Sequence, residues 1–294
     1  MPANAARPKT GFTLLELSIV LVIISLVIAT TFAILTQDVR HAKQTELQIK
    51  LDAIQTALLN FRRLNNRLPC PADATLPPTD PTSGAANQYF GVESTNSTPL
   101  CANGSSYSNG NRTVAASPGP TVNFYDGAHT VGGAVPVKTL GLPDDYALDP
   151  WNGQFAYFVD NRVTDTNFFI TSLPTDTNIG SMTVYDGSYY PAYDLTHGNP
   201  RTTKAIVVLL SYGPNGHGAF QANGNGSRKS SGSTDADEKQ NCHCDVDASN
   251  NIVAQPFDFN FVQHSASSNN FDDTVRYYVR SEFYSPSETG TMPR

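Results

Sequence analysis

The most constraining feature of the chain is a long apolar run near its amino end. Residues 12–35 read FTLLELSIVLVIISLVIATTFAIL and contain a single charged residue, Glu16. A helix of about 20 residues spans the apolar core of a bilayer, so this run predicts a membrane-spanning or filament-core helix. The residues before it include Arg7 and Lys9 and no acid, which favours their retention on the cytoplasmic side.

Two simpler interpretations of this run are disfavoured. A secretory signal peptide has an apolar region of about 7–15 residues, which is shorter than the run observed. A plain membrane anchor has no reason to keep Glu16, because a charge inside a bilayer costs about 3 kcal/mol or more. A positive charge supplied by another subunit would be a suitable partner for Glu16, so the acid indicates a role in assembly.

The residues Gly11 to Glu16 read GFTLLE, and this sequence resembles the prepilin cleavage and methylation motif of type IV pilins and type II secretion pseudopilins. The resemblance implies cleavage after Gly11 by a prepilin peptidase and N-methylation of the new terminus, Phe12. It also implies that Glu16 pairs with the terminal amine of a neighbouring pilin or pseudopilin subunit.

The helical pattern continues beyond the apolar run. Steps of four and three separate the apolar residues Leu47, Leu51, Ile54, Leu58 and Phe61. This spacing is typical of one face of an amphipathic helix. Neither proline nor glycine occurs between Phe12 and Leu68, and Pro69 disfavours helix before it. We therefore expect one helix from about residue 12 to residue 65, with its second half packed on a globular head.

The rest of the chain predicts a β-rich head. Strands are expected near 155–158, at 166–172, at 205–212 and at 274–280, the last with one wet face. The glycine-rich residues 213–218 predict a turn, and the polar stretch 223–247 predicts a loop. The segment Asp149-Pro150-Trp151 is similar to an Asp-Pro-Trp-Gly stretch of type II secretion pseudopilins, and Trp151 is expected to anchor the core.

Four cysteines, an even number, indicate disulfides and an oxidising compartment. Pairing of Cys70 with Cys101 would close a loop rich in proline, glycine and serine, which has little core of its own. A bond between Cys242 and Cys244 is sterically the least favourable, because one residue separates them. The choice among the three pairings stays open.

Other kinds of site have weaker support. Cys242, Cys244 and His217 lack the spacing of a structural zinc site, so no metal site is predicted. Asp235, Asp237 and Glu238 partly follow a calcium loop, but its glycine and terminal glutamate are missing. A calcium site therefore stays open, with no ligands assigned.

Enzymatic and nucleic-acid functions are not expected. Asp272 and Asp273 are adjacent, so on a strand they would point to opposite faces and would not share acid–base catalysis. No sequence motif of a hydrolase, metalloprotease or dinucleotide-binding protein is present. The net charge of −7 disfavours a nucleic-acid surface.

These observations predict an α+β, pilin-like subunit with four parts. Residues 1–11 form a leader, 12–35 a transmembrane or filament-core helix, 36–66 an amphipathic helix, and 67–294 a periplasmic β-rich head on an antiparallel sheet. The expected function is that of a structural subunit, minor rather than major, of a type IV pilus or type II secretion pseudopilus. Its location would be the bacterial inner membrane and then a filament or the cell surface. The alternative is a membrane-anchored binding protein or adhesin that uses the same anchor.

Overall fold

A computed structural model describes most of the helix and the core of the head. The described residues are 14–79, 86–94, 101, 107–108, 111–112, 124–125, 129–167, 179–187, 199–222, 228–254, 258–264 and 271–283, without the side chains of residues 29–36. The chain divides into two compact units, Met1–Glu46 and Leu47–Arg294; we call the second unit the head. Its helix and sheet give the expected α+β fold.

Helix α1 (Leu14–Asn65) runs through both units without interruption. It ends because Asn66 adopts the left-handed conformation, with φ of 50°. In this conformation the Asn66 amide donates to the carbonyl of Arg62 at 2.8 Å, which satisfies a carbonyl that the helix end would otherwise leave unpaired. The helix therefore ends at Asn65, before the residues whose helical conformation Pro69 would disfavour.

The apolar stripe predicted for the second half of α1 forms part of the head's core. Leu47, Leu51, Ile54 and Leu58 are fully buried, whereas Phe61 is partly exposed. The same helix buries the stem of Lys50, whose ammonium group donates to the carbonyls of Asp145 and Leu148 at 3.1 and 3.0 Å. Burial of the charged group is tolerated because these carbonyls replace its water partners.

The main sheet has seven strands in the described part of the head, in the order β10-β6-β7-β5-β4-β3, with β11 paired to β7. Their bounds are Phe124–Tyr125 (β3), Thr130–Ala134 (β4), Ala156–Asp160 (β5), Met182–Asp186 (β6), Asn199–Ser211 (β7), Asn260–Gln263 (β10) and Thr274–Val279 (β11). The long strand β7 pairs with β6 through its first part and with β5 and β11 through its second part. It is therefore the strand that holds the sheet together.

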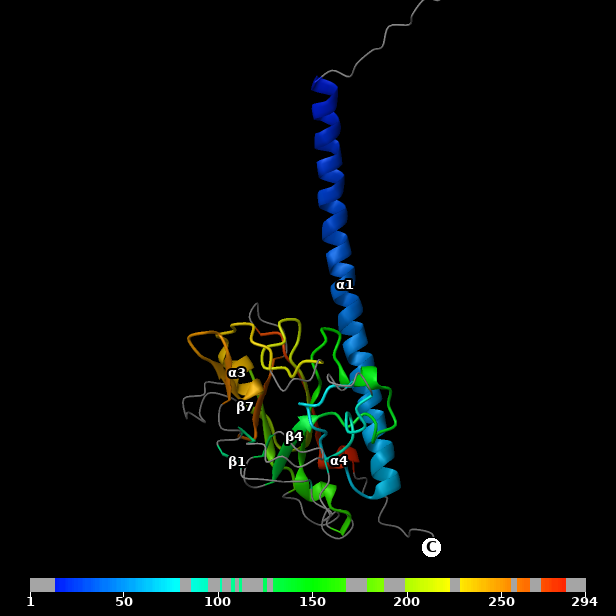
Figure 1. Ribbon diagram of the computed structural model, residues 1–294, viewed down its shortest axis with the longest axis vertical. Coiled ribbons are helices and arrows are strands. Elements are labelled where there is room, and N and C mark those ends of the chain that lie inside the picture. The colour runs from blue at the N-terminus through cyan, green and yellow to red at the C-terminus, as the bar shows by residue number, and fades with distance from the viewer. Residues whose placement is uncertain are drawn as a thin grey trace, which may run out of the picture. The chain divides into compact units, whose positions relative to one another are not determined.

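Smaller elements surround this sheet. They are the strand pairs β1 (Tyr107–Ser108) with β2 (Asn111–Arg112) and β8 (Cys244–Val246) with β9 (Ile252–Ala254), the helices α3 (Ala236–Cys242) and α4 (Arg280–Phe283), and the 3-10 turns η1 (Asp144–Ala147) and η2 (Asn161–Thr164). One apolar core joins α1 to one face of the sheet, and a second core contains Cys242 and Cys244 on the other face. Figure 1 shows the sheet between the last part of α1 and α3.

Two predictions of local structure were wrong, and a third is only partly tested by the described residues. The sheet is mixed rather than antiparallel, because β10 pairs with β6 in parallel. The stretch 223–247 contains α3 and β8, although residues 223–227 lie outside the described part. In the segment 166–172, Thr166 and Asn167 are helical and the remaining residues lie outside the described part.

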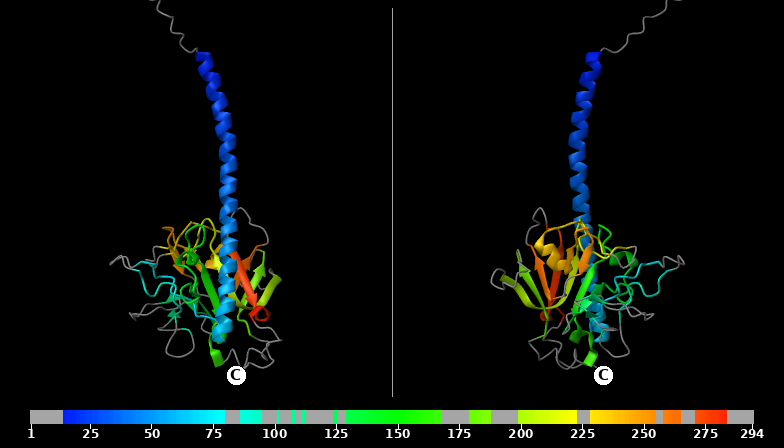
Figure 2. Two further views of the ribbon diagram at one scale, coloured as in Figure 1. Left: turned by 90° about the vertical axis from the view of Figure 1, so that its right-hand side faces the viewer. Right: turned by 60° about the vertical axis from the view of Figure 1, so that its left-hand side comes forward.

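The predicted wet face of the last strand is covered. Tyr278 on β11 is buried in the core that contains α1. On the same strand Arg276 donates to the side chains of Asp52 and Gln48 on α1, and Figure 2 shows β11 beside this part of the helix. The helix thus occupies the face that alternation in the sequence assigned to solvent.

The buried stripe of α1 should dominate the stability of the head. Leu51→Ala is expected to lower the free energy of unfolding by about 2–5 kcal/mol, because it removes buried methyl groups and leaves a cavity. The matched control is Ile49→Ala on the exposed side of the same turn, where a change below about 0.5 kcal/mol is expected. Urea unfolding of the detergent-solubilised chain measures both, and equal losses would contradict the packing described.

Candidate functional site

The assembly residue predicted from sequence lies at the beginning of α1. Glu16 is the acidic residue of the helix's first turn and its side chain is exposed. An acid in this position is favourable because the helix dipole places partial positive charge at the amino end. Gly11 and Phe12, the predicted processing residues, lie outside the described residues.

The helix beyond Glu16 exposes apolar side chains on all its faces. Between residues 14 and 28, every leucine, isoleucine and valine is 47–87% exposed. An apolar surface of this extent is typical of a protein or membrane contact. Among the described residues, no helix is both long enough and apolar enough to qualify as a membrane span.

The structure joins the four cysteines as two disulfides, Cys70 with Cys101 and Cys242 with Cys244. The second bond forms although only one residue separates its cysteines. His243 between these cysteines adopts the left-handed conformation at the end of α3, and this bend brings their Cα atoms to 5.1 Å. His217 lies within reach of both sulfurs, but sulfurs joined in a disulfide are not the thiolates that bind zinc.

The first disulfide lies beside a partly buried ion pair. Arg67 and Glu93 form two hydrogen bonds of 2.7 and 2.8 Å, and the amide of Cys70 donates to Glu93 at 2.9 Å. Donation of hydrogen bonds to the Glu93 carboxylate raises the pKa of Arg67. Tyr157 on β5 donates to the carbonyl of Pro69 at 3.0 Å. These contacts fix the chain that leaves α1 against the sheet.

Loss of the Glu93 charge should weaken this attachment. Glu93→Gln is expected to lower the free energy of unfolding by about 1–2 kcal/mol, because hydrogen bonds to charged groups are stronger than neutral ones. Asp186→Asn, which weakens a more exposed pair with Arg201, should cost less than about 1 kcal/mol. Chemical denaturation under non-reducing conditions compares the two variants, and a larger loss for Asp186→Asn would refute the assignment.

The segment that resembles the pseudopilin stretch forms a tight turn around Asp149. The buried Asp149 carboxylate accepts from the amides of Trp151 and Gly153, both at 2.9 Å, and from the hydroxyl of Ser211 at 2.7 Å. Burial raises the pKa of Asp149, and these hydrogen bonds oppose that rise. Trp151 is only partly buried, so the aspartate rather than the tryptophan organises this turn.

An acidic residue of α3 meets two adjacent acidic residues that lie far away in the sequence. Oxygens of Glu238, Asp272 and Asp273 lie within 4.8 Å of one another. Desolvation, followed by the charge of Glu238, raises the pKa of Asp273 well above its usual range. Burial likewise raises the pKa of Asp272 to about 6. We call these three residues the acidic cluster.

The calcium-loop pattern considered in the sequence has a different structural role. Asp235 caps α3 by accepting from the amides of Asp237 and Glu238. The carboxylate of Asp237 contacts His264 at 2.6 Å. Only Glu238 of that pattern joins the acidic cluster, and no local sequence signal predicted its meeting with Asp272 and Asp273.

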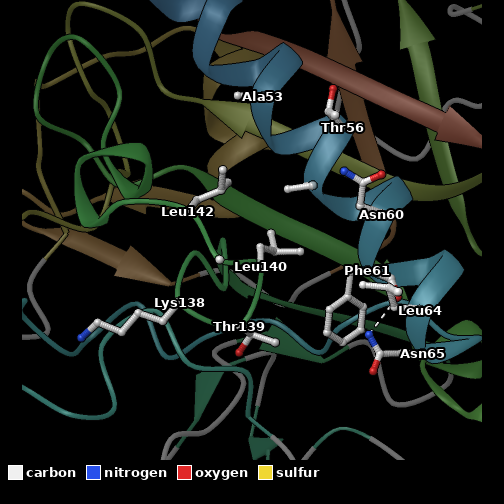
Figure 3. A pocket seen from close by; sticks show the side chains of 12 residues that line it. Ala53, Thr56, Asn60, Phe61, Leu64, Asn65, Lys138, Thr139, Leu140 and Leu142 are labelled. Carbon is white, nitrogen blue, oxygen red and sulfur yellow. Dashed lines mark hydrogen bonds between the residues drawn. The ribbon is translucent and has the colours of Figure 1, made fainter.

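An open groove runs along the last turns of α1. Its volume is about 750 Å³, and it lies between helix residues 53–65 and the turn 138–142. Figure 3 shows Phe61 from the helix on one side and Leu140 and Leu142 from the turn on the other. Among its described lining residues only Lys138 is titratable, and no sequence pattern had indicated the groove.

Comparison with known proteins identifies the amino-terminal segment. Residues 6–32 match the family model described as the prokaryotic N-terminal methylation motif. No curated protein and no solved structure matches the chain. The matched residues include Gly11, Phe12 and Glu16, the three positions singled out in the sequence. The chain therefore carries a prepilin-type N-terminal methylation motif, consistent with a type IV pilin-like protein.

Proposed function

We propose that the protein is a structural subunit, minor rather than major, of a type IV pilus or a type II secretion pseudopilus. A prepilin peptidase would cleave it after Gly11, and Phe12 would become the N-methylated terminus. The subunit would sit in the bacterial inner membrane with its head in the periplasm. It would then enter a filament through its amino-terminal helix.

The observation that carries this proposal is the combination of an exposed apolar helix with one acid near its start. A helix that is apolar on all faces requires an apolar environment, which a bilayer or a bundle of identical helices provides. Transfer of Glu16 into that environment is unfavourable unless a positive charge accompanies it. Cleavage after Gly11 would create such a charge on every subunit, four residues before Glu16.

The arrangement of the head supports the same function. Only the part of α1 from Leu47 onward belongs to the head, and its buried stripe is fully used by the head's own core. The residues before Glu46 remain for contacts with lipid or with other subunits. One segment of α1 thus packs in the head, and the other is available for contacts with neighbouring subunits, as a filament subunit requires.

The charge on Glu16 should matter for assembly but not for membrane insertion. Glu16→Ala is expected to reduce incorporation into sheared filaments at least tenfold, because the amine of the neighbouring subunit loses its counter-charge. The amount of protein in the membrane fraction should stay unchanged. Quantitative immunoblots of both fractions measure the two effects.

Ser18→Ala is the matched control for Glu16→Ala. The Ser18 hydroxyl donates only to the Leu15 carbonyl within the same helix, so its loss removes a polar group without removing a charge. Normal incorporation is expected for Ser18→Ala. Normal incorporation of Glu16→Ala as well would exclude the proposed charge pairing.

Processing of the amino end gives a separate test. The intact mass of the mature protein should correspond to residues 12–294 plus one methyl group. Gly11→Val should retain the leader, because a branched side chain replaces the smallest residue at the cleavage position. Detection of an unprocessed Met1 in the mature wild-type protein would contradict the proposal.

The alternative function, a membrane-anchored binding protein or adhesin, has the groove beside α1 as its structural support. It differs from the filament function in what deletion of the gene does. A filament subunit should be present in purified filaments or be needed for their formation. If the protein is a binding protein, deletion of its gene should leave filaments intact and should abolish only binding to its ligand or surface.

A further inference from the structure

The acidic cluster joins two elements of the head. Glu238 belongs to α3, and Asp272 and Asp273 immediately precede β11. Glu238 is completely buried, Asp273 is 9% exposed, and Asp272 is partly exposed. A buried carboxylate is unfavourable unless a positive charge or a proton neutralises it, so the groups around the three acids decide whether they ionise.

Neutral amides orient the carboxyl groups of the cluster. Asn215 donates its side-chain amide to Glu238 Oε1 at 2.7 Å and its backbone amide to Asp272 Oδ2 at 2.9 Å. Asn241 donates its side-chain amide to Asp273 Oδ2 at 3.0 Å. These contacts hold one oxygen of each acid, and none of them supplies a positive charge.

The second oxygen of each carboxyl group lacks a hydrogen bond within the described part of the chain. Glu238 Oε2, Asp272 Oδ1 and Asp273 Oδ1 are all buried and unpaired. Among the described residues, no lysine, arginine or histidine forms an ion pair with any of the three acids. Buried acceptors without donors are rare in folded proteins. A bound proton supplies both the missing donor and the missing positive charge, because a protonated carboxyl group donates a hydrogen bond.

Burial and like charges both act on the two aspartates. Burial is the larger effect, and it raises the pKa of Asp273 well above its usual range and the pKa of Asp272 to about 6. The charge of Glu238 adds to both rises, and Asp235 at the start of α3 adds to the rise for Asp273. Lys229 opposes the rise for Asp272 without forming an ion pair with it. The surroundings thus favour the neutral form of the aspartates.

Other titratable groups lie near the cluster on the elements packed against it. Tyr212, which follows β7, interacts electrostatically with Asp273, and burial raises the pKa of this phenol to about 12. His264 contacts Asp237, the neighbour of the cluster on α3, at 2.6 Å. Burial lowers the pKa of His217, so this residue makes the head more stable as the pH rises. A comparison of variants at one pH cancels these shared contributions.

We propose that Glu238, Asp272 and Asp273 form a proton-binding site that makes the attachment of α3 to the sheet dependent on pH. The bound proton joins two carboxyl groups through their otherwise unpaired oxygens. Its loss leaves neighbouring negative charges that repel one another, and the contact between α3 and the beginning of β11 weakens. Asn241 carries the change to β10, because its side-chain amide also binds the N–H and the carbonyl of Val262. This proposal does not rest on the filament function.

The raised pKa values set the sign of the pH dependence. A carboxyl group with a higher pKa in the folded chain than in the unfolded chain contributes stability at low pH. That contribution is lost as the pH rises from about 4, the unfolded value, to the folded value. For Asp272 the loss is complete near pH 6, and for Asp273 it continues to higher pH. The folding constant should fall by up to about tenfold per pH unit for each proton retained.

Urea unfolding of the full-length chain in detergent, at pH 5 and at pH 8, tests the proposal. Fluorescence of Trp151, the only tryptophan of the chain, reports unfolding of the head. Asp273→Asn places a neutral side chain of the same shape in the cluster. The ratio of its folding constant to that of the wild type should be at least about tenfold larger at pH 8 than at pH 5. The same ratio at both pH values would overturn the proposal.

Two further variants separate the cluster from the other acids of the chain. Glu238→Gln removes the charge that raises the pKa of both aspartates, and its ratio should change with pH in the same direction as that of Asp273→Asn. Asp144→Asn alters an exposed acid in η1 and is the matched control, with a change below about threefold expected. An equal change in Asp144→Asn would assign the effect to the net charge of the chain and not to the cluster.

Hydrogen exchange at pH 8 tests the link to α3. Peptides that cover α3 and β10 should exchange at least about tenfold more slowly in Asp273→Asn than in the wild type, because the helix opens less often. Both proteins are compared at one pH, so the intrinsic pH dependence of exchange cancels. Equal exchange of these peptides would show that the cluster does not control the attachment of α3.

Discussion

The packing of one helical stripe against the sheet is the interaction on which the head depends. Strand β7 has apolar residues on both faces, with Val207 and Leu209 in the core shared with α1 and Val208 and Leu210 in the opposite core. A strand of this kind must be covered on both sides. The carboxyl-terminal part of α1 covers one face, so the helix is a structural component of the head and not merely its tether.

The two parts of α1 differ in their exposure to solvent. The stripe from Leu47 onward is buried in the head's core, whereas the apolar side chains between residues 14 and 28 are exposed. The residues between these two regions contain no glycine or proline, so the helix is not interrupted where its environment changes.

The helix and the central strand were predictable because their signals are local. Steps of three and four identify the stripe, and a continuous apolar run identifies β7, whose two faces are both buried. Helix α3 was not predictable, because its seven residues are mostly polar and depend on distant partners such as Val262. The covered face of β11 was missed because the residues that contact Arg276 lie on α1, far away in the sequence.

The candidate sites follow the same distinction. Gly11, Phe12 and Glu16 lie within one short stretch of the sequence, so a local motif identifies them. The acidic cluster exists only after α3 packs beside β11, because Glu238 and Asp272 are far apart in the chain. Asp149 was overlooked in favour of Trp151 because large aromatic residues usually anchor cores, whereas here a small acid collects three donors.

The contact between Arg276 and Asp52 joins residues 224 positions apart, and it has a consequence for biosynthesis. Until residues 274–279 have been made, β7 lacks one of its neighbours and the docking face of α1 is only partly covered. An unfinished chain therefore displays apolar surface on the same helix that carries part of the methylation motif. Complete synthesis of the head is therefore a condition for covering that surface.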